Sequence, residues 1–353
     1  MKILVTGACG WIGRKVCEYL SAQGVEVVGA DVIPVNSVWL IVNGGFLSAY
    51  VQIDITRPIE KDLTSDLGSP LSEINAVIHC AGYAHRPNET PEEQKLFYAV
   101  NRDGTKHVLD WCARNDVNRF LYVSSIAFYN WDLEGRRPRR PDVRSERPRT
   151  LQVSEDHPIS LPTHYAKSKY EGEQLVRSSS LDWRVVRLAT VFGEGDRANF
   201  SRMANAMKKR IFPIPGRGGA RKSVIPVDLA AELIAEFALM NKPSHQLINL
   251  GLPAAPSLKE ICSAYHEVCG LPKCPTIPMP LAKGLGRCGD LAAKILGKFP
   301  FTSDTLRKLT TDTVVSVARM QECFPDREFG SFQDYLAACA EWYKSRKRDG
   351  FKS

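Results

Sequence analysis

Tyr165 and Lys169, near the middle of the chain, have the chemistry to move a proton. They are four positions apart, so a helix would place both side chains on one face. A free tyrosine, with a pKa of about 10, is a poor base at neutral pH. A neighbouring ammonium favours the phenolate. The pair could therefore accept a proton from a hydroxyl group on a substrate.

The N-terminus carries a glycine pattern that suits a bound dinucleotide. Residues 6–13 space three glycines evenly, between an apolar run at 2–5 and an amphipathic stretch at 11–23. In a strand–turn–helix context, such glycines permit a tight turn, close approach of a pyrophosphate and packing of helix on strand. The helix start would face the phosphates, although a glycine-rich turn without a ligand is the alternative. The residues expected to contact the dinucleotide here are Gly7, Gly10, Trp11, Ile12 and Gly13.

Asp31 indicates which dinucleotide is bound. It ends the apolar run at 25–31 and follows Gly13 by 18 residues. An acid about 20 residues after the glycines typically bonds the adenosine ribose, and its charge would repel a 2′-phosphate. We therefore predict NAD rather than NADP, although Asp31 could instead be a turn residue. Asp54, with Ile55 beside it, could meet the adenine, but aspartate is also common in turns.

A serine completes the reactive set. Ser124 and Ser125 end a predicted strand on the cofactor side. Ser124 would point into the sheet by alternation, which leaves Ser125 to bond the substrate oxygen and share its proton with Tyr165. Lys169 would also bond the nicotinamide ribose. The predicted catalytic residues are Ser125, Tyr165 and Lys169.

These residues need a scaffold, and the first half of the chain alternates strand and helix patterns. Strands are expected at 76–79, 119–123 and 183–187, and helices at 92–114 and 163–178. This alternation predicts an α/β protein with a doubly wound parallel sheet, a Rossmann fold. We expect it to span residues 1–188, with residues 223–250 returning to it. Residues 189–353 are expected to form a smaller, mainly helical substrate lobe, with helices at 229–240, 258–268 and 332–346.

Composition narrows the class of protein. The chain has 353 residues, 44% of them hydrophobic, which is enough for a sizeable core. It has no apolar run of the roughly 20 residues that span a bilayer, and we expect no signal peptide and a cytoplasmic location. The ten cysteines lack Cys-x-x-Cys pairs and neighbouring histidine ligands. They are therefore expected to be buried thiols, with no metal site.

The net charge of +8 is concentrated in residues 136–149 and 344–352. Nucleic-acid binding is the first interpretation of such a charge. These stretches lack interleaved aromatic residues and any nucleic-acid motif, so we predict solvated loops or an electrostatic funnel for an anionic substrate. Residues 138–151 have no periodicity and are expected to form an insertion or mobile loop.

Together these motifs resemble the extended short-chain dehydrogenase/reductase family, in particular its nucleotide-sugar epimerase/dehydratase branch. The matching segments are residues 6–13, 79–82, 100–105, 124–125, 165–169, 187–193 and 221–230. The resemblance implies NAD as cofactor, lined by Ala81 and Gly82, with Asn101 supporting the site. It also implies a nucleoside-diphosphate sugar as substrate and a homodimer. The implied substrate contacts are His85, Ser125, Thr190, Asn199 and Arg221.

Arg221 matches the arginine that grips the substrate diphosphate in this family. A fixed planar cation suits that role; a surface cation in a basic loop is the alternative. Ile126 and Ala127 replace the acid-containing pair of the family's dehydratases, which disfavours dehydration. Thr190 replaces a substrate-contacting asparagine, and Asn130 replaces a glycine.

We therefore predict NAD-dependent epimerisation, at C4 of the sugar, through a 4-keto intermediate. The alternative is a reductase or dehydrogenase that acts once at the same carbon. Residues 79–85 and 198–200 also resemble family members that reduce a 4-keto sugar nucleotide. A third possibility, a regulator that binds cofactor without catalysis, has no need of an intact serine–tyrosine–lysine set.

Overall fold

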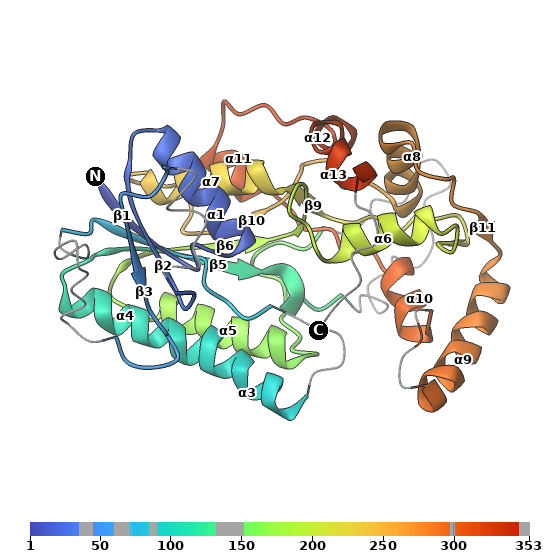
Figure 1. The fold of residues 1–353 in the computed structure, drawn as a ribbon, viewed down its shortest axis with the longest axis horizontal. Coiled ribbons are helices and arrows are strands. Elements are labelled where there is room, and N and C mark those ends of the chain that lie inside the picture. Colours follow the sequence, from blue (N-terminus) through green and yellow to red (C-terminus); the bar gives the residue numbers. More distant parts are fainter. Residues whose placement is uncertain are drawn as a thin grey trace.

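The computed structural model describes residues 1–34, 45–59, 71, 73–84, 90–131, 152–296, 299 and 301–345. Its centre is a seven-stranded sheet in which every neighbouring pair of strands is parallel (Figure 1). The order across the sheet is β10 (Leu247–Leu250), β6 (Asp182–Leu188), β5 (Arg119–Ser125), β4 (Ala76–His79), β1 (Lys2–Thr6), β2 (Glu26–Asp31) and β3 (Ala49–Gln52). The predicted doubly wound sheet is confirmed, and the chain order reverses beside β1, where such folds bind ligands.

Helices cover both faces of the sheet (Figure 1). One face carries α1 (Trp11–Ala22), α7 (Val227–Leu239) and α11 (Ala318–Cys323); the other carries α3 (Pro91–Tyr98), α4 (Thr105–Arg114) and α5 (His164–Arg177). Successive side chains of β1 point to opposite faces of the sheet. Ile3 and Val5 join the apolar core under α1 and α7, whereas Leu4 joins the core under α4 and α5.

The helix expected over residues 92–114 contains an irregular turn. A π-helical segment, η2 (Ala99–Gly104), separates α3 from α4. At Gly104 the backbone lies so close to Ile55 that a Cβ would be 2.9 Å from its side chain. Such wide turns insert one extra residue into a helix and often mark functional sites. The predicted helix is therefore present, but an apolar period of about 3.6 residues cannot reveal the insertion within it.

The C-terminal helix is also divided. The pattern at 332–346 forms α12 (Phe332–Ala338) and α13 (Ala340–Ser345), and Arg346 lies outside the described residues. The break turns α13 toward the loop before α6 (Asn199–Lys208), where Trp342 donates to the carbonyl of Asp196 at 3.3 Å.

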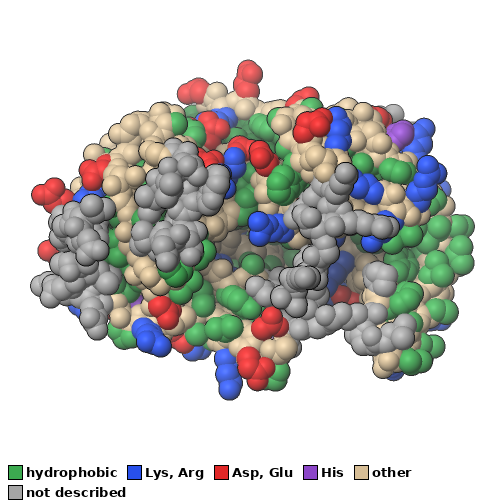
Figure 2. All heavy atoms as spheres, viewed as in Figure 1, with side chains coloured by type: hydrophobic (Ala, Val, Ile, Leu, Met, Phe, Trp, Pro, Cys, Tyr) green, Lys and Arg blue, Asp and Glu red, His purple; other side chains and the backbone are tan. Residues whose placement is uncertain are grey.

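The remaining elements of the second half lie beside the sheet (Figure 1). They are β7 (Thr190–Phe192), β8 (Ile214–Pro215), β9 (Val224–Pro226), α8 (Leu258–Cys269), β11 (Thr276–Ile277), α9 (Met279–Leu296) and α10 (Ser303–Thr310). Figure 2 shows this face hollowed between the sheet and these elements. Residues 138–151, the predicted loop, lie outside the described residues, and the division into domains at residue 188 stays a prediction. None of the described helices is both long and apolar enough to span a bilayer.

Candidate active site

The glycine turn between β1 and α1 is shaped by close backbone approaches. Gly7 has a φ of 70°, and a Cβ there would lie 2.6 Å from the amide nitrogen of Ala81. A Cβ on Gly13 would lie 2.1 Å from the carbonyl oxygen of Gly7, to which Gly10 N–H donates at 2.9 Å. Side chains are thus excluded from the turn that opens α1, which fits a backbone cradle for a pyrophosphate.

Asp31 is held at the carboxyl end of β2. Its carboxylate accepts hydrogen bonds from the backbone N–H of Cys9 at 3.0 Å and of Val32 at 2.8 Å. These bonds hold the carboxylate beside the glycine turn. A residue that hydrogen-bonds the adenosine ribose must lie in this position. The residues present therefore fit a dinucleotide such as NAD.

Asp54 and Ile55 lie in the loop after β3. Asp54 accepts from the N–H and the hydroxyl of Thr56, at 3.0 and 2.7 Å, and these bonds lower the pKa of its carboxyl. That is the local turn considered as the alternative. Ile55 is buried against Gly104 of the π-turn. A contact of either residue with adenine stays a prediction.

Trp11 couples the glycine turn to the second half of the chain. Its indole N–H donates to the carbonyl of Glu194 at 2.6 Å, and a Cβ on Gly195 would lie 2.6 Å from the same nitrogen. Ile12, next to it, is partly buried and packs on the main core.

The three predicted catalytic residues are brought together at the end of β5. A hydrogen bond with Ser125 lowers the pKa of Tyr165, against the larger effect of burial, which raises it. Lys169 is buried, donates to the carbonyl of Val123 at 2.7 Å and lies 4.1 Å from the ring centroid of Tyr122. Burial lowers the pKa of Lys169 to about 7.

Asn101, from the π-turn, links three parts of the site. Its amide N–H donates to the hydroxyl of Ser168 at 3.0 Å, and its oxygen accepts from the N–H of Tyr83 at 2.8 Å. A Cβ on Gly82 would lie 3.3 Å from that oxygen and 3.8 Å from the ammonium nitrogen of Lys169. The π-turn therefore fixes the loop after β4 against α5.

A buried chain of polar groups behind this site was missed by the sequence analysis. Thr6 and His79 share a hydrogen bond at 2.6 Å, and His79 shares another with Thr105 at 3.1 Å. The Thr105 hydroxyl donates to the carbonyl of Asn101, so it accepts from Nε2 of His79. Burial, and secondarily Lys169, lowers the pKa of His79 to about 3. The neutral ring therefore links β1 and β4 to Thr105 at the start of α4, which in turn bonds the π-turn.

A second buried network was also missed. Glu173, two turns after Tyr165 on α5, accepts from Nη2 and Nε of Arg187, at 2.6 and 3.1 Å. Ser124, which the alternation predicted to point into the sheet, donates to the same carboxylate of α5 at 2.8 Å. Arg187 also donates to the hydroxyl of Tyr129 at 2.7 Å. The sequence did contain a signal for this network, because Glu173 and Arg187 are charged residues within a predicted helix and a predicted strand.

The predicted substrate residues are more dispersed. Thr190 begins β7, and Asn199 is exposed at the start of α6. The guanidinium of Arg221 donates to the carbonyl of Ala255 at 2.7 Å and lies 3.7 Å from the carboxylate of Glu260. His85 lies outside the described residues. Substrate contacts of these residues stay predictions.

Several known proteins are similar to this chain. It is 24% identical to the N-acetyl-alpha-D-glucosaminyl-diphospho-ditrans,octacis-undecaprenol 4-epimerase of Escherichia coli O157:H7, over 88% of this chain and 86% of that protein. It is 25% identical to the UDP-glucose 4-epimerase of Vibrio cholerae, over 91% and 88% respectively. The solved UDP-glucuronic acid 4-epimerase from Bacillus cereus, in complex with NAD, covers 98% of this chain and 99% of its own, with 19% identity and a TM-score of 0.69, and so shares the fold.

The profile of a single family spans most of the chain. It matches residues 3–251, which contain the glycine turn, Asp31, the π-turn and the Ser125, Tyr165 and Lys169 set. The chain therefore belongs to the NAD dependent epimerase/dehydratase family.

Proposed function

We propose that this chain is an NAD-dependent 4-epimerase of a sugar bound through a diphosphate to a nucleoside. The observation that carries the proposal is the hydrogen bond between Ser125 and Tyr165 beside the buried Lys169. A relay of this kind has a use only where a hydroxyl proton is removed or returned. NAD is the cofactor of the family, and the glycine turn and Asp31 fit it.

Each residue has a distinct part in the proposed reaction. Tyr165 accepts the proton of the sugar 4-hydroxyl, and Ser125 holds the same oxygen. The ammonium form of Lys169 favours the phenolate of Tyr165. NAD would be held by the glycine turn and Asp31, and would supply the hydride acceptor and donor that oxidation and reduction at C4 require. Arg221 holds the diphosphate while the 4-keto sugar turns over between the two transfers.

The segment after Ser125 favours epimerisation over dehydration. Ile126 is buried, and the N–H of Ala127 donates to the Ser125 hydroxyl at 3.1 Å. Neither side chain can shuttle a proton to C5 or C6, as elimination of water requires. The same residues would serve a reductase acting once at C4, so the two functions must be separated by redox balance.

The test supplies sugar nucleotides to the purified protein without added cofactor and follows the C4 configuration by NMR. An epimerase regenerates its cofactor in each cycle, so interconversion without net NADH change is expected. Activity only on a keto sugar, with stoichiometric loss of NAD(P)H, would replace this proposal with the reductase.

The carrier of the sugar diphosphate differs between the two curated relatives. The name of the Vibrio cholerae protein specifies UDP, and that of the Escherichia coli O157:H7 protein specifies a diphospho-undecaprenol. Arg221 would address the diphosphate, which both carriers share. The substrate panel should therefore include lipid-linked as well as nucleoside-linked sugar diphosphates.

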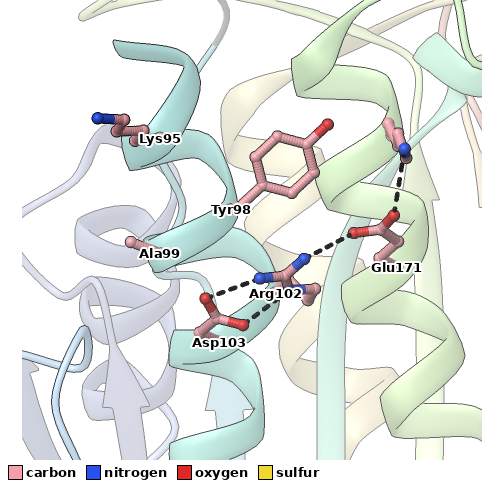
Figure 3. A pocket seen from close by; sticks show the side chains of 7 residues that line it. Lys95, Tyr98, Ala99, Arg102, Asp103 and Glu171 are labelled. Carbon is pink, nitrogen blue, oxygen red and sulfur yellow. Dashed lines mark hydrogen bonds and ion pairs between the residues drawn. The ribbon is translucent and has the colours of Figure 1, made fainter. Parts of the chain in front are cut away.

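We further propose a homodimer that packs through the outer face of α3, η2 and α5. This face, opposite Tyr165 and Lys169 on α5, has a shallow hollow of about 440 Å³ (Figure 3). Arg102 bridges its two walls, with Asp103 at 2.7 Å and Glu171 at 3.5 Å. Light scattering of the full chain tests the proposal, since a monomer at micromolar concentration contradicts it. The hollow is lined by Lys95, Tyr98, Ala99, Arg102, Asp103, Lys167 and Glu171.

We also propose a cytoplasmic location. All ten cysteines are free thiols, which suits a reducing compartment. Fractionation of the native host's cells tests this proposal.

A further inference from the structure

We propose that the outer face of α9 binds the surface of a membrane rich in anionic lipid. Large hydrophobic side chains are rarely exposed in the described part of this chain, but they gather on this helix. Of the eleven that are exposed, five lie between residues 281 and 299. Figure 2 shows hydrophobic side chains gathered at the right-hand edge, where Figure 1 places α9. Four are on α9, namely Leu281 (53% exposed), Leu285 (46%), Leu291 (62%) and Ile295 (84%). Phe299 (42%) follows the helix and lies beside Gly289, on the attached face.

The helix is attached to the protein by a different face. Ala282, Gly286 and Gly289 are buried at helical spacing. A Cβ on Gly286 would lie 3.3 Å from Ser303, and one on Gly289 would lie 1.8 Å from the carbonyl oxygen of Phe301. These small residues let α9 pack closely against the segment that leads into α10. The leucines and the isoleucine are therefore left unburied by the fold.

Cationic side chains accompany this apolar stripe. At about 3.6 residues per turn, Lys283, Arg287 and Lys294 align along one side of it. The helix has one acid, Asp290, which accepts from the N–H of Ser303 at 2.9 Å on the side toward α10. The outer face thus joins an apolar stripe to a basic one, the pattern of helices that lie in a membrane interface.

The charge selects lipid over a second copy of the chain. Self-association through this face would bring the same three cations together across the contact. Phosphate headgroups would neutralise them while the apolar side chains enter the acyl boundary. An 18-residue helix without bilayer-spanning character can lie on a membrane surface without crossing it.

A neighbouring segment adds to the same pattern. Ile211 is 61% exposed and follows the exposed Lys209 and Arg210. It precedes β8, which pairs with β11, the strand from which the chain enters α9. Residues 209–211, which are also basic and apolar, therefore lead into the two-stranded sheet from which α9 begins.

The consequence for the substrate rests on the proposed function. A site that holds a sugar diphosphate, in a protein docked through α9, can take its substrate from the membrane. A sugar diphosphate carried on a lipid is then a second substrate class, beside the nucleoside-linked sugar of the proposed function. The docking itself needs neither substrate nor cofactor, so it can be tested alone.

Cys288 offers a direct test, because it is the one exposed cysteine among ten and lies on the apolar stripe of α9. The full chain is labelled there with an environment-sensitive maleimide dye and mixed with phospholipid vesicles. Vesicles containing phosphatidylglycerol should shift the emission to the blue, and vesicles of phosphatidylcholine alone should not. An unchanged emission with both vesicle types overturns the proposal.

Sedimentation with the same vesicles tests the residues. Leu291→Asp/Ile295→Asp should abolish sedimentation, while Leu96→Asp, an exposed leucine on α3, should not. Lys283→Gln/Lys294→Gln should weaken binding about 25-fold, at about fivefold for each charge near an anionic surface. Equal sedimentation of the wild type and the aspartate variant overturns the proposal. It is also overturned if the wild type forms dimers through α9 and does not bind the vesicles.

The two proposals fail separately. Vesicle binding with no turnover of any sugar diphosphate would remove the proposed function and leave the membrane surface. Turnover of sugar nucleotides by a protein that does not bind vesicles would refute membrane binding through α9 and support the epimerase function.

Discussion

The cofactor side and the substrate side of the candidate site are built differently. On the cofactor side, Asp31, Asn101 and Lys169 are each fixed by hydrogen bonds to backbone or buried side chains. On the substrate side, Arg221 is 36% exposed and is shared between a carbonyl and the carboxylate of Glu260. The predicted cofactor residues are therefore held by the fold itself, whereas Arg221, the predicted diphosphate ligand, is partly exposed and has a carboxylate 3.7 Å away.

The largest expected effect is at the junction of the two sides. Tyr165→Phe keeps the ring and removes the oxygen that takes the proton, so kcat should fall by about 10²–10⁴-fold, as for a lost general base. NAD affinity, measured by titration, should stay near the wild-type value, because the glycine turn and Asp31 are untouched. Near-normal turnover by the variant would refute the relay.

Glu173→Ala tests whether buried pairing fixes the cofactor side. The change leaves the guanidinium of Arg187 buried and without the partner that accepts from it at 2.6 and 3.1 Å. Breaking one side of a buried ion pair typically costs about 3–5 kcal/mol. Urea denaturation should show a loss of this size. Glu171→Ala, on the exposed side of the same helix, is the control and should cost less than about 1 kcal/mol.

Much of the cofactor side could be predicted from the sequence, because its geometry depends on local rules. Three glycines at fixed spacing and an acid at the end of β2 identify the turn without tertiary information. The helix period placed Tyr165 and Lys169 on one face, whereas the place of Ser125 beside Tyr165 rested on the resemblance to the family. Those same rules missed the π-turn at Ala99–Gly104, because one inserted residue leaves the apolar pattern almost unchanged.

The buried network and the exposed helix could not be predicted for a different reason. The pairing of Glu173 with Arg187 joins residues 14 positions apart on α5 and β6, so it depends on how these elements meet. The apolar pattern of α9 is the same whether its leucines face a core or solvent. Their exposed fractions, and the packing of Gly286 and Gly289 on the opposite side, show that they face solvent.

Arg221→Ala sharpens the contrast on the substrate side. A charged hydrogen bond to the diphosphate is worth about 1.5–3 kcal/mol, so KM should rise by roughly tenfold to a hundredfold, with little change in unfolding free energy. Glu260→Gln, which keeps the capping geometry of α8, should lower KM because it removes a competing anion 3.7 Å away. A KM for Arg221→Ala equal to that of the wild type would assign the arginine to the protein surface.

The smallest expected effect concerns the cost of burying Lys169 on the cofactor side. Burial lowers the pKa of its ammonium from 10.5 to about 7 in the folded protein. Between these values the unfolded chain binds more protons, so the contribution of Lys169 to stability improves as pH rises and is lost as pH falls toward 7. The slope approaches about 1.4 kcal/mol per pH unit.

Urea denaturation of the wild type and of Lys169→Met, without added NAD, tests this expectation. From pH 7 to pH 9, the unfolding free energy of the wild type should rise by about 2 kcal/mol relative to that of the variant. Other titrating groups cancel in this comparison, and Lys167→Met, on the exposed face of α5, should retain the wild-type slope. A difference that does not change with pH would mean that Lys169 keeps its proton in the folded protein, and that its ammonium is stabilised by contacts other than those seen here.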